Sequence, residues 1–258
     1  MSGSSAVPGA FNLRDLAATP LAQRAVRPGQ VFRSDLLHRI DAQAAHNWLA
    51  DRNVGLVVDL RTEGERDADG FLATDGSFAV AHVPLMDEVW SWEDERDHDG
   101  ESFLRDRTIE IFERHPDRIV SVLDLIAEAD GPTLFHCTAG KDRTGVVACV
   151  LLGVIGAPNE TIIADYSASA LAMPALMGYY RDLHAQTRGG DAVAEFDEQK
   201  AALLLERAAT PFTMSSVLDH LASSEGSLLQ WATSRGLADS AVSVLRQRLQ
   251  QSTQNEGQ

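Results

Sequence analysis

Cysteine is scarce in this chain of 258 residues, which contains only Cys137 and Cys149. Two thiols are too few for the disulfide framework of small secreted domains, and a reactive free thiolate suits a reducing compartment. Cys149 lies in an apolar segment, where a buried core thiol is the expected role, with a regulatory disulfide to Cys137 as the alternative. The shortage of cysteine thus excludes a disulfide-rich fold.

A long hydrophobic run is also missing, since no apolar segment approaches the roughly eighteen residues that span a bilayer. Residues 1–10 contain neither a basic start nor a hydrophobic segment, so we expect no secretory signal peptide. We therefore expect a cytoplasmic protein without stable membrane association, with export by another route left open. The hydrophobic content of 44% predicts one domain over residues 9–250, with disordered tails at 1–8 and 251–258.

Positive charge is in short supply, with 22 Lys and Arg residues against 38 Asp and Glu residues and a net charge of −16. This balance, without any Lys/Arg cluster, excludes nucleic acid and anionic membranes as general partners. Between residues 87 and 101, eight carboxylates accompany Arg96 alone. We expect a solvated loop there, or alternatively an acidic rim that disfavours highly phosphorylated ligands.

The most informative segment that is present is His136–Gly145, which reads HCTAGKDRTG. Residues 132–135 before it predict a short buried strand, and residues 144–155 after it predict a helix that is buried because it is apolar on nearly every side. Inward backbone N–H groups and the helix N-terminus would attract an anion to the loop between them. We expect phosphate to be bound by the backbone of Thr138, Ala139, Gly140, Lys141, Asp142 and Arg143.

Cys137 and Arg143 fit the chemistry of phosphate-ester hydrolysis. The field of the loop and the guanidinium should hold Cys137 as a thiolate nucleophile, and Arg143 can bind two phosphoryl oxygens. A buried, inert thiol is the alternative, but the strand and helix on either side disfavour it. A nucleotide-binding phosphate loop is excluded, because Phe135 stands where that motif requires glycine. We expect no metal or other cofactor, since the loop itself supplies the positive field.

The same segment resembles the signature loop of the cysteine-based protein-tyrosine phosphatase superfamily. Its GKDRTG form is similar to bacterial tyrosine and lipid phosphatases of the mycobacterial phosphatase B type. Other segments resemble that family in the same order along the chain: Asn12–Leu16, Phe32–Asp35, Val57–Arg61, Gly153–Gly156 and Asp165–Tyr166. One departure is Ala17-Ala18, where the family usually has a glycine pair. The resemblance covers most of residues 10–240 and implies an α/β fold, with a central twisted, mainly parallel sheet flanked by helices and a helical lid at 165–210.

The resemblance also implies roles within the loop. Cys137 would attack phosphorus, and His136 would orient it from behind. Thr144 would hydrogen-bond the thiolate, or would only cap the following helix. Lys141 resembles the lysine of phosphoinositide phosphatases, where added positive charge meets further phosphates. Asp142 beside it is able to neutralise that lysine, which keeps tyrosine phosphate as a substrate.

A general acid must protonate the leaving oxygen, and the sequence offers three aspartates for this role. Asp87 is the first choice, because it follows Phe78–Val83 in a Pro-x-x-Asp loop similar to the mobile acid loop of dual-specificity phosphatases. Asp59 closes the predicted strand at 55–58, and ligands of such folds gather at the carboxyl ends of strands. Asp142 lies in the loop itself. For each, the alternative is a solvated or ion-paired carboxylate.

Helix boundaries follow from the apolar spacing and from turn residues. The spacing from Ser34 to Arg52 predicts one amphipathic helix, and Pro116 predicts a break between two helices within 105–129. Ser227 and Asp239 are expected to cap helices near the C-terminus.

The sequence therefore predicts a phosphatase that hydrolyses phosphate monoesters through a cysteinyl-phosphate intermediate and releases inorganic phosphate. Phosphotyrosine is the main expected substrate, with phosphoserine, phosphothreonine and phosphoinositides as further ones. The alternatives are a phosphate-binding pseudoenzyme that docks phosphorylated partners and a phytase-like inositol polyphosphate phosphatase. The intact Cys137 and Arg143 disfavour the first, and the scarcity of lysine disfavours the second.

Overall fold

A five-stranded sheet forms the centre of the computed structural model, which describes residues 9–90, 100–188 and 209–251. Its strands are β1 (Arg14–Asp15), β2 (Val31–Ser34), β3 (Leu56–Asp59), β4 (Ala79–His82) and β5 (Thr133–His136). They lie in the order β1-β2-β5-β3-β4, and β1 alone runs antiparallel to its neighbour. The predicted mainly parallel sheet is therefore confirmed. Most of both predicted tails lies outside the described residues.

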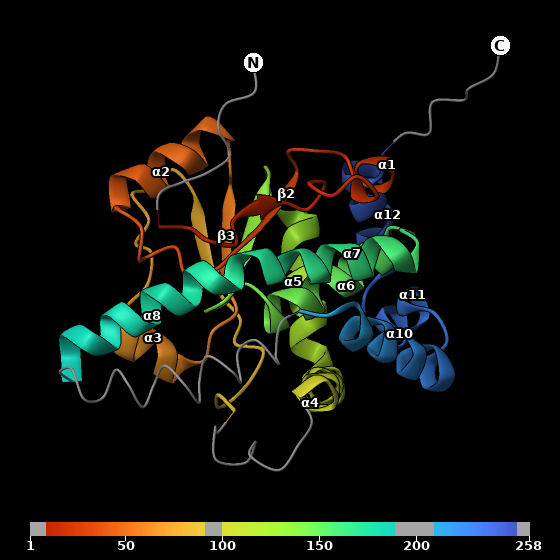
Figure 1. The fold of residues 1–258 in the computed structure, drawn as a ribbon. Helices are drawn as coiled ribbons and strands as arrows, with labels where there is room; N and C mark the ends of the chain where they lie inside the picture. Colours follow the sequence, from red (N-terminus) through yellow and green to blue (C-terminus); the bar gives the residue numbers. More distant parts are fainter. Residues whose placement is uncertain (1–8, 91–99, 189–208, 252–258) are drawn as a thin grey trace.

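Helices flank this sheet, as Figure 1 shows. They are α1 (Ala22–Ala25), α2 (Ala42–Asp51), α3 (Glu63–Asp69), α4 (Gly100–Arg114), α5 (Pro116–Glu128), α6 (Asp142–Val154), α7 (Asn159–Ala168), the 3₁₀-helix η2 (Ser169–Ala172), α8 (Met173–Arg188), α10 (Pro211–Glu225), α11 (Leu228–Ser234) and α12 (Asp239–Leu249). Among these described helices, none combines the length and the apolar character needed to cross a membrane.

Alternate side chains of the central strands enter two different hydrophobic clusters. Leu134 of β5 and Val57 of β3 join a cluster that includes Trp48 of α2. Phe135 and Val58, the next residues of the same strands, join the larger cluster that surrounds α6. Both faces of the sheet are thus buried, which explains why the strands read as short apolar runs.

The strand register brings polar residues together at the carboxyl edge of the sheet. Ser34 and Asp59 are both paired with His136, and His82 is paired with Asp59. The carboxyl ends of parallel strands are where ligands of α/β sheets bind. Cys137 follows β5 directly, so the predicted phosphate-binding loop begins at this edge, next to the polar residues of the neighbouring strands.

The helix predicted over residues 34–52 is wrong in its N-terminal half. Ser34 is the last residue of β2, and α2 begins only after Asp41, whose carboxylate accepts the amide hydrogen of Ala44 at 2.9 Å. Leu37, which is apolar at helical spacing, is instead buried in the connecting loop. Burial against the sheet has overridden the local periodicity.

The other boundary predictions are mostly confirmed. α4 ends at Arg114 and α5 begins with Pro116, where the missing amide hydrogen costs nothing. Ser227 caps α11 in a capping box with Gln230. Asp239 is the first residue of α12 rather than its cap, so that prediction is wrong.

The start of α8 lies against the loop that follows β5. Met173 belongs to a small apolar cluster that packs on Phe11 and on Ala139 of the loop. Figure 1 shows α8 continuing from α7 and extending toward α3. α8 falls within the lid predicted at 165–210, of which residues 189–208 lie outside the described chain.

Candidate active site

The loop between β5 and α6 is held from outside by its carbonyl groups. The amide nitrogen of the Asn12 side chain donates to the carbonyls of Ala139 and Gly140, each at 2.9 Å. Arg33 donates to the carbonyl of Gly140 at 2.8 Å and to the next one at 3.3 Å. Within the described chain, the backbone amides of residues 138–140 donate to no protein acceptor. They are therefore free to bind an anion.

Gly140 is required by both conformation and space. Its φ is +66°, and an added Cβ would lie 2.6 Å from the carbonyl oxygen of Ser34 and 2.7 Å from the amide nitrogen of Asp35. A side chain would therefore be strained and would push the loop away from β2. This contact is the physical reason for the glycine in the motif.

Cys137 lines a pocket of about 100 Å³ at this loop. The other residues that line it are Met86, Val89, Trp90, Thr138, Ala139, Asp142 and Arg143. Helix α6 begins at Asp142, so the pocket lies at the N-terminus of a helix of 13 residues. The positive end of that helix favours a bound anion and a thiolate.

Thr144 does not cap α6, so that alternative is wrong. The helix begins two residues earlier than predicted, and Lys141 occupies the position of its cap. The hydroxyl of Thr144 is buried and has no hydrogen-bond partner in the described chain. The bond between this hydroxyl and the Cys137 thiolate stays a prediction.

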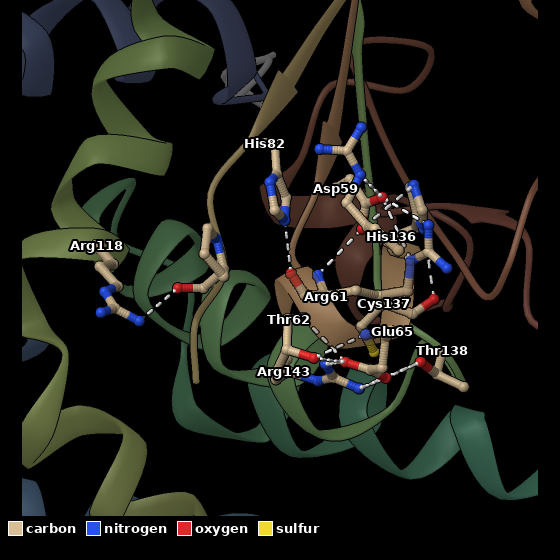
Figure 2. A network of polar contacts seen from close by, with 12 residues as sticks. Asp59, Arg61, Thr62, Glu65, His82, Arg118, His136, Cys137, Thr138 and Arg143 are labelled. Atoms are coloured by element: carbon tan, nitrogen blue, oxygen red, sulfur yellow. Dashed lines mark hydrogen bonds and ion pairs between the residues drawn. The ribbon is translucent and has the colours of Figure 1, made fainter. Parts of the chain in front are cut away.

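Glu65 holds Arg143 in place, a role that the sequence did not indicate. Its carboxylate accepts from both terminal nitrogens of Arg143, at 2.5 and 2.9 Å, and from the hydroxyl of Thr138. The same carboxylate closes the capping box of α3 with Thr62. Figure 2 shows Glu65 between these partners. The Thr-x-x-Glu spacing indicates a helix start, but no local pattern links it to a loop 78 residues away.

The two charges of this pair stabilise each other. Burial opposes ionisation of Glu65, yet Arg143 and Thr138 hold its pKa down at about 2. Burial also opposes the charge of Arg143, but the neighbouring Cys137 and Glu65 raise its pKa above the usual value. Of the five N–H groups of a guanidinium, contacts in the described chain use three. Two are left for phosphoryl oxygens.

The carboxylate of Asp59 forms an ion pair with Arg61 and is not directed at Cys137. Both of its oxygens accept from Arg61, the closest at 2.8 Å, and it does not line the Cys137 pocket (Figure 2). Burial opposes its ionisation, but His136 and Arg61 hold its pKa at about 2. Asp59 therefore has no proton to donate near neutral pH, which argues against it as the general acid.

His136 lies between Asp59 and the nucleophile. Its Nε2 is 4.0 Å from a carboxylate oxygen of Asp59, and its Nδ1 is 3.4 Å from the carbonyl oxygen of Cys137. Burial lowers its pKa, so the ring is neutral at neutral pH. This position agrees with the predicted orienting role behind the cysteine.

Asp87 points away from the Cys137 pocket. Its side chain is 69% exposed and pairs with Arg118 at 2.6 Å, and Arg118 also donates to the carbonyl of Pro84 at 3.0 Å. Asp87 lines a neighbouring pocket and is absent from the lining that contains Cys137. In this conformation, the carboxylate that the sequence favours as general acid is ion-paired outside the lining of the Cys137 pocket.

Asp142 alone among the three candidate aspartates lines the pocket with Cys137. Its Oδ1 accepts from the hydroxyl of Tyr166 at 3.2 Å and lies 3.6 Å from Nζ of Lys141. Lys141 is 5% exposed and does not line the pocket. The geometry thus favours the aspartate that the sequence ranked last.

Cys149 does not line this pocket, whereas the acidic segment at 87–101 contributes Val89 and Trp90 to it. Cys149 is buried in the core, and burial raises its pKa far above the usual value, which describes an unreactive thiol. Most of the acidic segment at 87–101 lies outside the described residues. Within the described ranges, no group of three or more His, Cys, Asp or Glu residues is arranged to bind a metal ion.

Comparisons with known proteins find similarity along most of the chain. A family model described as the tyrosine phosphatase family matches residues 5–251. The triple specificity protein phosphatase PtpB of Mycobacterium tuberculosis is 33% identical over 200 residues, which cover 66% of this chain and 70% of that protein. A tyrosine-protein phosphatase of Nostoc commune is 32% identical over 168 residues, which cover 60% of this chain and 53% of that one.

A crystal structure of TpbA from P. aeruginosa is also similar, at 20% sequence identity and a TM-score of 0.32. The match covers 74% of this chain and 86% of that one. At this level of similarity it supports no inference about the site.

Replacing Gly140 by alanine should distort the loop. We expect Gly140→Ala to lower the free energy of unfolding by about 1–3 kcal/mol, the usual cost of overpacking, and to abolish turnover and vanadate binding. Gly236→Ala is the matched control, since Gly236 has φ +105° but no atom within 4 Å of the added Cβ. Urea unfolding and phosphate release compare the two variants. Normal turnover by Gly140→Ala would show that the close contact with β2 is not needed.

Replacing Glu65 by glutamine should release Arg143. We expect Glu65→Gln to lower kcat and to weaken vanadate binding. Thr62→Ala removes the helix cap and one hydroxyl bond to Glu65 but keeps both contacts of Glu65 with Arg143, so it should lower stability with little effect on kcat. Because the folded-state pKa of Glu65 is depressed to about 2, its stabilising effect is full above its unfolded pKa and is lost as the pH falls toward the folded value. The unfolding free energies of wild type and Glu65→Gln should therefore converge with falling pH. An unchanged difference between them in acid would contradict this assignment.

Proposed function

Because the chain belongs to the tyrosine phosphatase family, we propose that it hydrolyses phosphotyrosine in proteins through a cysteinyl-phosphate intermediate. One observation carries the proposal: Cys137 and Arg143 line one pocket, at a loop in which the backbone amides of residues 138–140 donate to no acceptor in the described protein. The printed names of the two curated relatives, a triple specificity phosphatase and a tyrosine-protein phosphatase, support it.

In the first step, the thiolate of Cys137 attacks phosphorus and the bond to the ester oxygen breaks. Loop amides and Arg143 stabilise the charge that develops on the non-bridging oxygens. The leaving oxygen takes a proton from Asp142, so the dephosphorylated product departs as a neutral alcohol or phenol.

In the second step, water attacks the phosphorus of the phosphocysteine. Asp142, now a carboxylate, accepts the proton of that water, and the P–S bond breaks. Inorganic phosphate leaves, and both the thiolate and the protonated acid are restored. No redox change occurs, and the loop supplies the positive field in both steps.

The shape of the pocket favours an aromatic leaving group. Met86, Val89 and Trp90 add apolar side chains to the lining of the pocket, which suits the ring of a phosphotyrosine. Lys141 does not line the pocket, and its ammonium lies 3.6 Å from Asp142. Together with the net charge of −16, this disfavours inositol polyphosphates. Phosphoserine, phosphothreonine and monophosphorylated phosphoinositides are the further substrates we propose.

Replacing Cys137 by serine should abolish phosphate release from a phosphotyrosine peptide and from a monophosphorylated phosphoinositide. Peptide binding, measured by calorimetry, should remain, because the amides and Arg143 are untouched. Cys149→Ser is the control, since it changes a thiol in the core and should retain turnover. If wild type binds the peptide without any turnover, a docking pseudoenzyme becomes the correct description.

Replacing Asp142 by asparagine should remove the general acid while it keeps the shape of the side chain. We expect kcat/KM to fall by about 10²–10⁴-fold with phenyl phosphate, the usual contribution of a general acid. The loss should be much smaller with 4-nitrophenyl phosphate, whose leaving group needs no proton. Asp87→Asn and Asp59→Asn are the comparisons, and a larger leaving-group-dependent loss in either of them would contradict the assignment.

A further inference from the structure

Helix α7 supplies two consecutive side chains to the region of the catalytic loop. Asp165 forms an ion pair with Arg33, the residue that holds the loop carbonyls, and lies 3.4 Å from Arg14. Tyr166, the next residue, reaches the first turn of α6 instead. Figure 1 shows α7 beside α6, where this contact is made. One helix thus supports the loop through Arg33 and contacts the start of the helix that follows the loop.

The ring of Tyr166 lies directly against Gly145. A Cβ added to Gly145 would be 2.8 Å from one ring carbon of Tyr166 and 3.1 Å from another. Tyr166 is 1% exposed, so its ring is fixed by packing on every side. The glycine of the Arg-Thr-Gly sequence therefore makes room for this ring, which leaves the hydroxyl at the N-terminus of α6.

The hydroxyl of Tyr166 distinguishes the two oxygens of Asp142. It donates to Oδ1 at 3.2 Å, and Lys141 approaches the same oxygen at 3.6 Å. In the described ranges, no residue binds Oδ2. Burial and the neighbouring Asp142 raise the pKa of Tyr166 well above its usual value, so the hydroxyl keeps its proton and stays a donor. A proton on Asp142 is thereby assigned to Oδ2.

We propose that Tyr166 is a positioning residue for the general acid: it binds Oδ1 of Asp142, so that the catalytic proton is carried on Oδ2. This rests on the proposed function, in which Asp142 is the acid. As the P–O bond breaks, the proton of Oδ2 passes to the leaving oxygen and Asp142 becomes a carboxylate. The proton of the attacking water returns to Oδ2 in the second step, while Tyr166 keeps its own proton throughout.

The test is Tyr166→Phe, which removes the hydroxyl and keeps the ring. We expect kcat/KM for phenyl phosphate to fall about tenfold, in keeping with the loss of a hydrogen bond to a charged group. With 4-nitrophenyl phosphate, the change should be under about twofold, because that leaving group needs no acid. Tyr180→Phe is the matched control, since the Tyr180 hydroxyl is also buried but has no partner in the described chain. It should leave both values unchanged.

The double variant Tyr166→Phe/Asp142→Asn separates the possible outcomes. If Tyr166 acts through Asp142, the tyrosine change should cause no further loss once Asp142 is replaced. An equal loss on both substrates, or the same loss in the Asp142→Asn background, would show a merely structural role and overturn the proposal. If Asp142→Asn itself shows no leaving-group dependence, both the acid and its positioning residue are wrong, whereas the effect of Cys137→Ser still tests the phosphatase reaction separately.

Discussion

A cradle made of backbone amides can exist only if the carbonyl groups of the same peptide units are satisfied elsewhere. A buried carbonyl without a partner costs about as much as a lost hydrogen bond. Here Asn12 and Arg33 donate hydrogen bonds to those carbonyls, and each of the two residues is held in place by an aspartate. Asp35 accepts the backbone amide of Asn12 at 3.1 Å, and Asp165 pairs with Arg33. The N-terminal segment, β2 and α7 are thereby assembled around one loop.

The buried charged residues around the loop fix its geometry and add little to the stability of the fold. Arg33, Asp35 and Asp165 are all essentially inaccessible to solvent, and removing such charges from water commonly offsets the attraction between them. Burial and the nearby Arg33 lower the pKa of Arg14 to about 10, which still leaves it charged at neutral pH. Deleting one member would leave the others as uncompensated buried charges. The network therefore fixes the loop by making alternative arrangements costly.

Local patterns predicted those parts of the protein that depend on neighbours in sequence. The strand before Cys137, the helix after it and the break at Pro116 all follow from apolar runs and turn residues. The partners of the loop do not, because Asn12 contacts it across 127 positions and Glu65 across 78. A single sequence has no periodicity that encodes such distances. Asn12 appears only in a segment that resembles the family, and the Thr-x-x-Glu spacing that contains Glu65 indicates only the start of a helix.

The general acid is a second place where the sequence leaves side-chain partners open. A Pro-x-x-Asp loop describes Asp87 correctly, but it says nothing of Arg118, which binds that carboxylate from 31 positions away. Likewise, the strand end at Asp59 was predicted well, while Arg61, only two residues later, neutralises it. Both aspartates are at the expected places in the fold, and each forms an ion pair there, so the proposal of Asp142 as the acid rests on the pocket lining.

In the proposed mechanism, nucleophile, arginine and acid all lie between Cys137 and Arg143, so their spacing is set by one short segment. The orientation of their side chains is not, because each can rotate about its own bonds. The structure supplies that orientation from both sides: Glu65 of α3 fixes Arg143, and Tyr166 of α7 fixes Asp142. Such support lets a contiguous motif act as a preorganised site. The motif carries the reacting groups, while helices distant in sequence determine where those groups point.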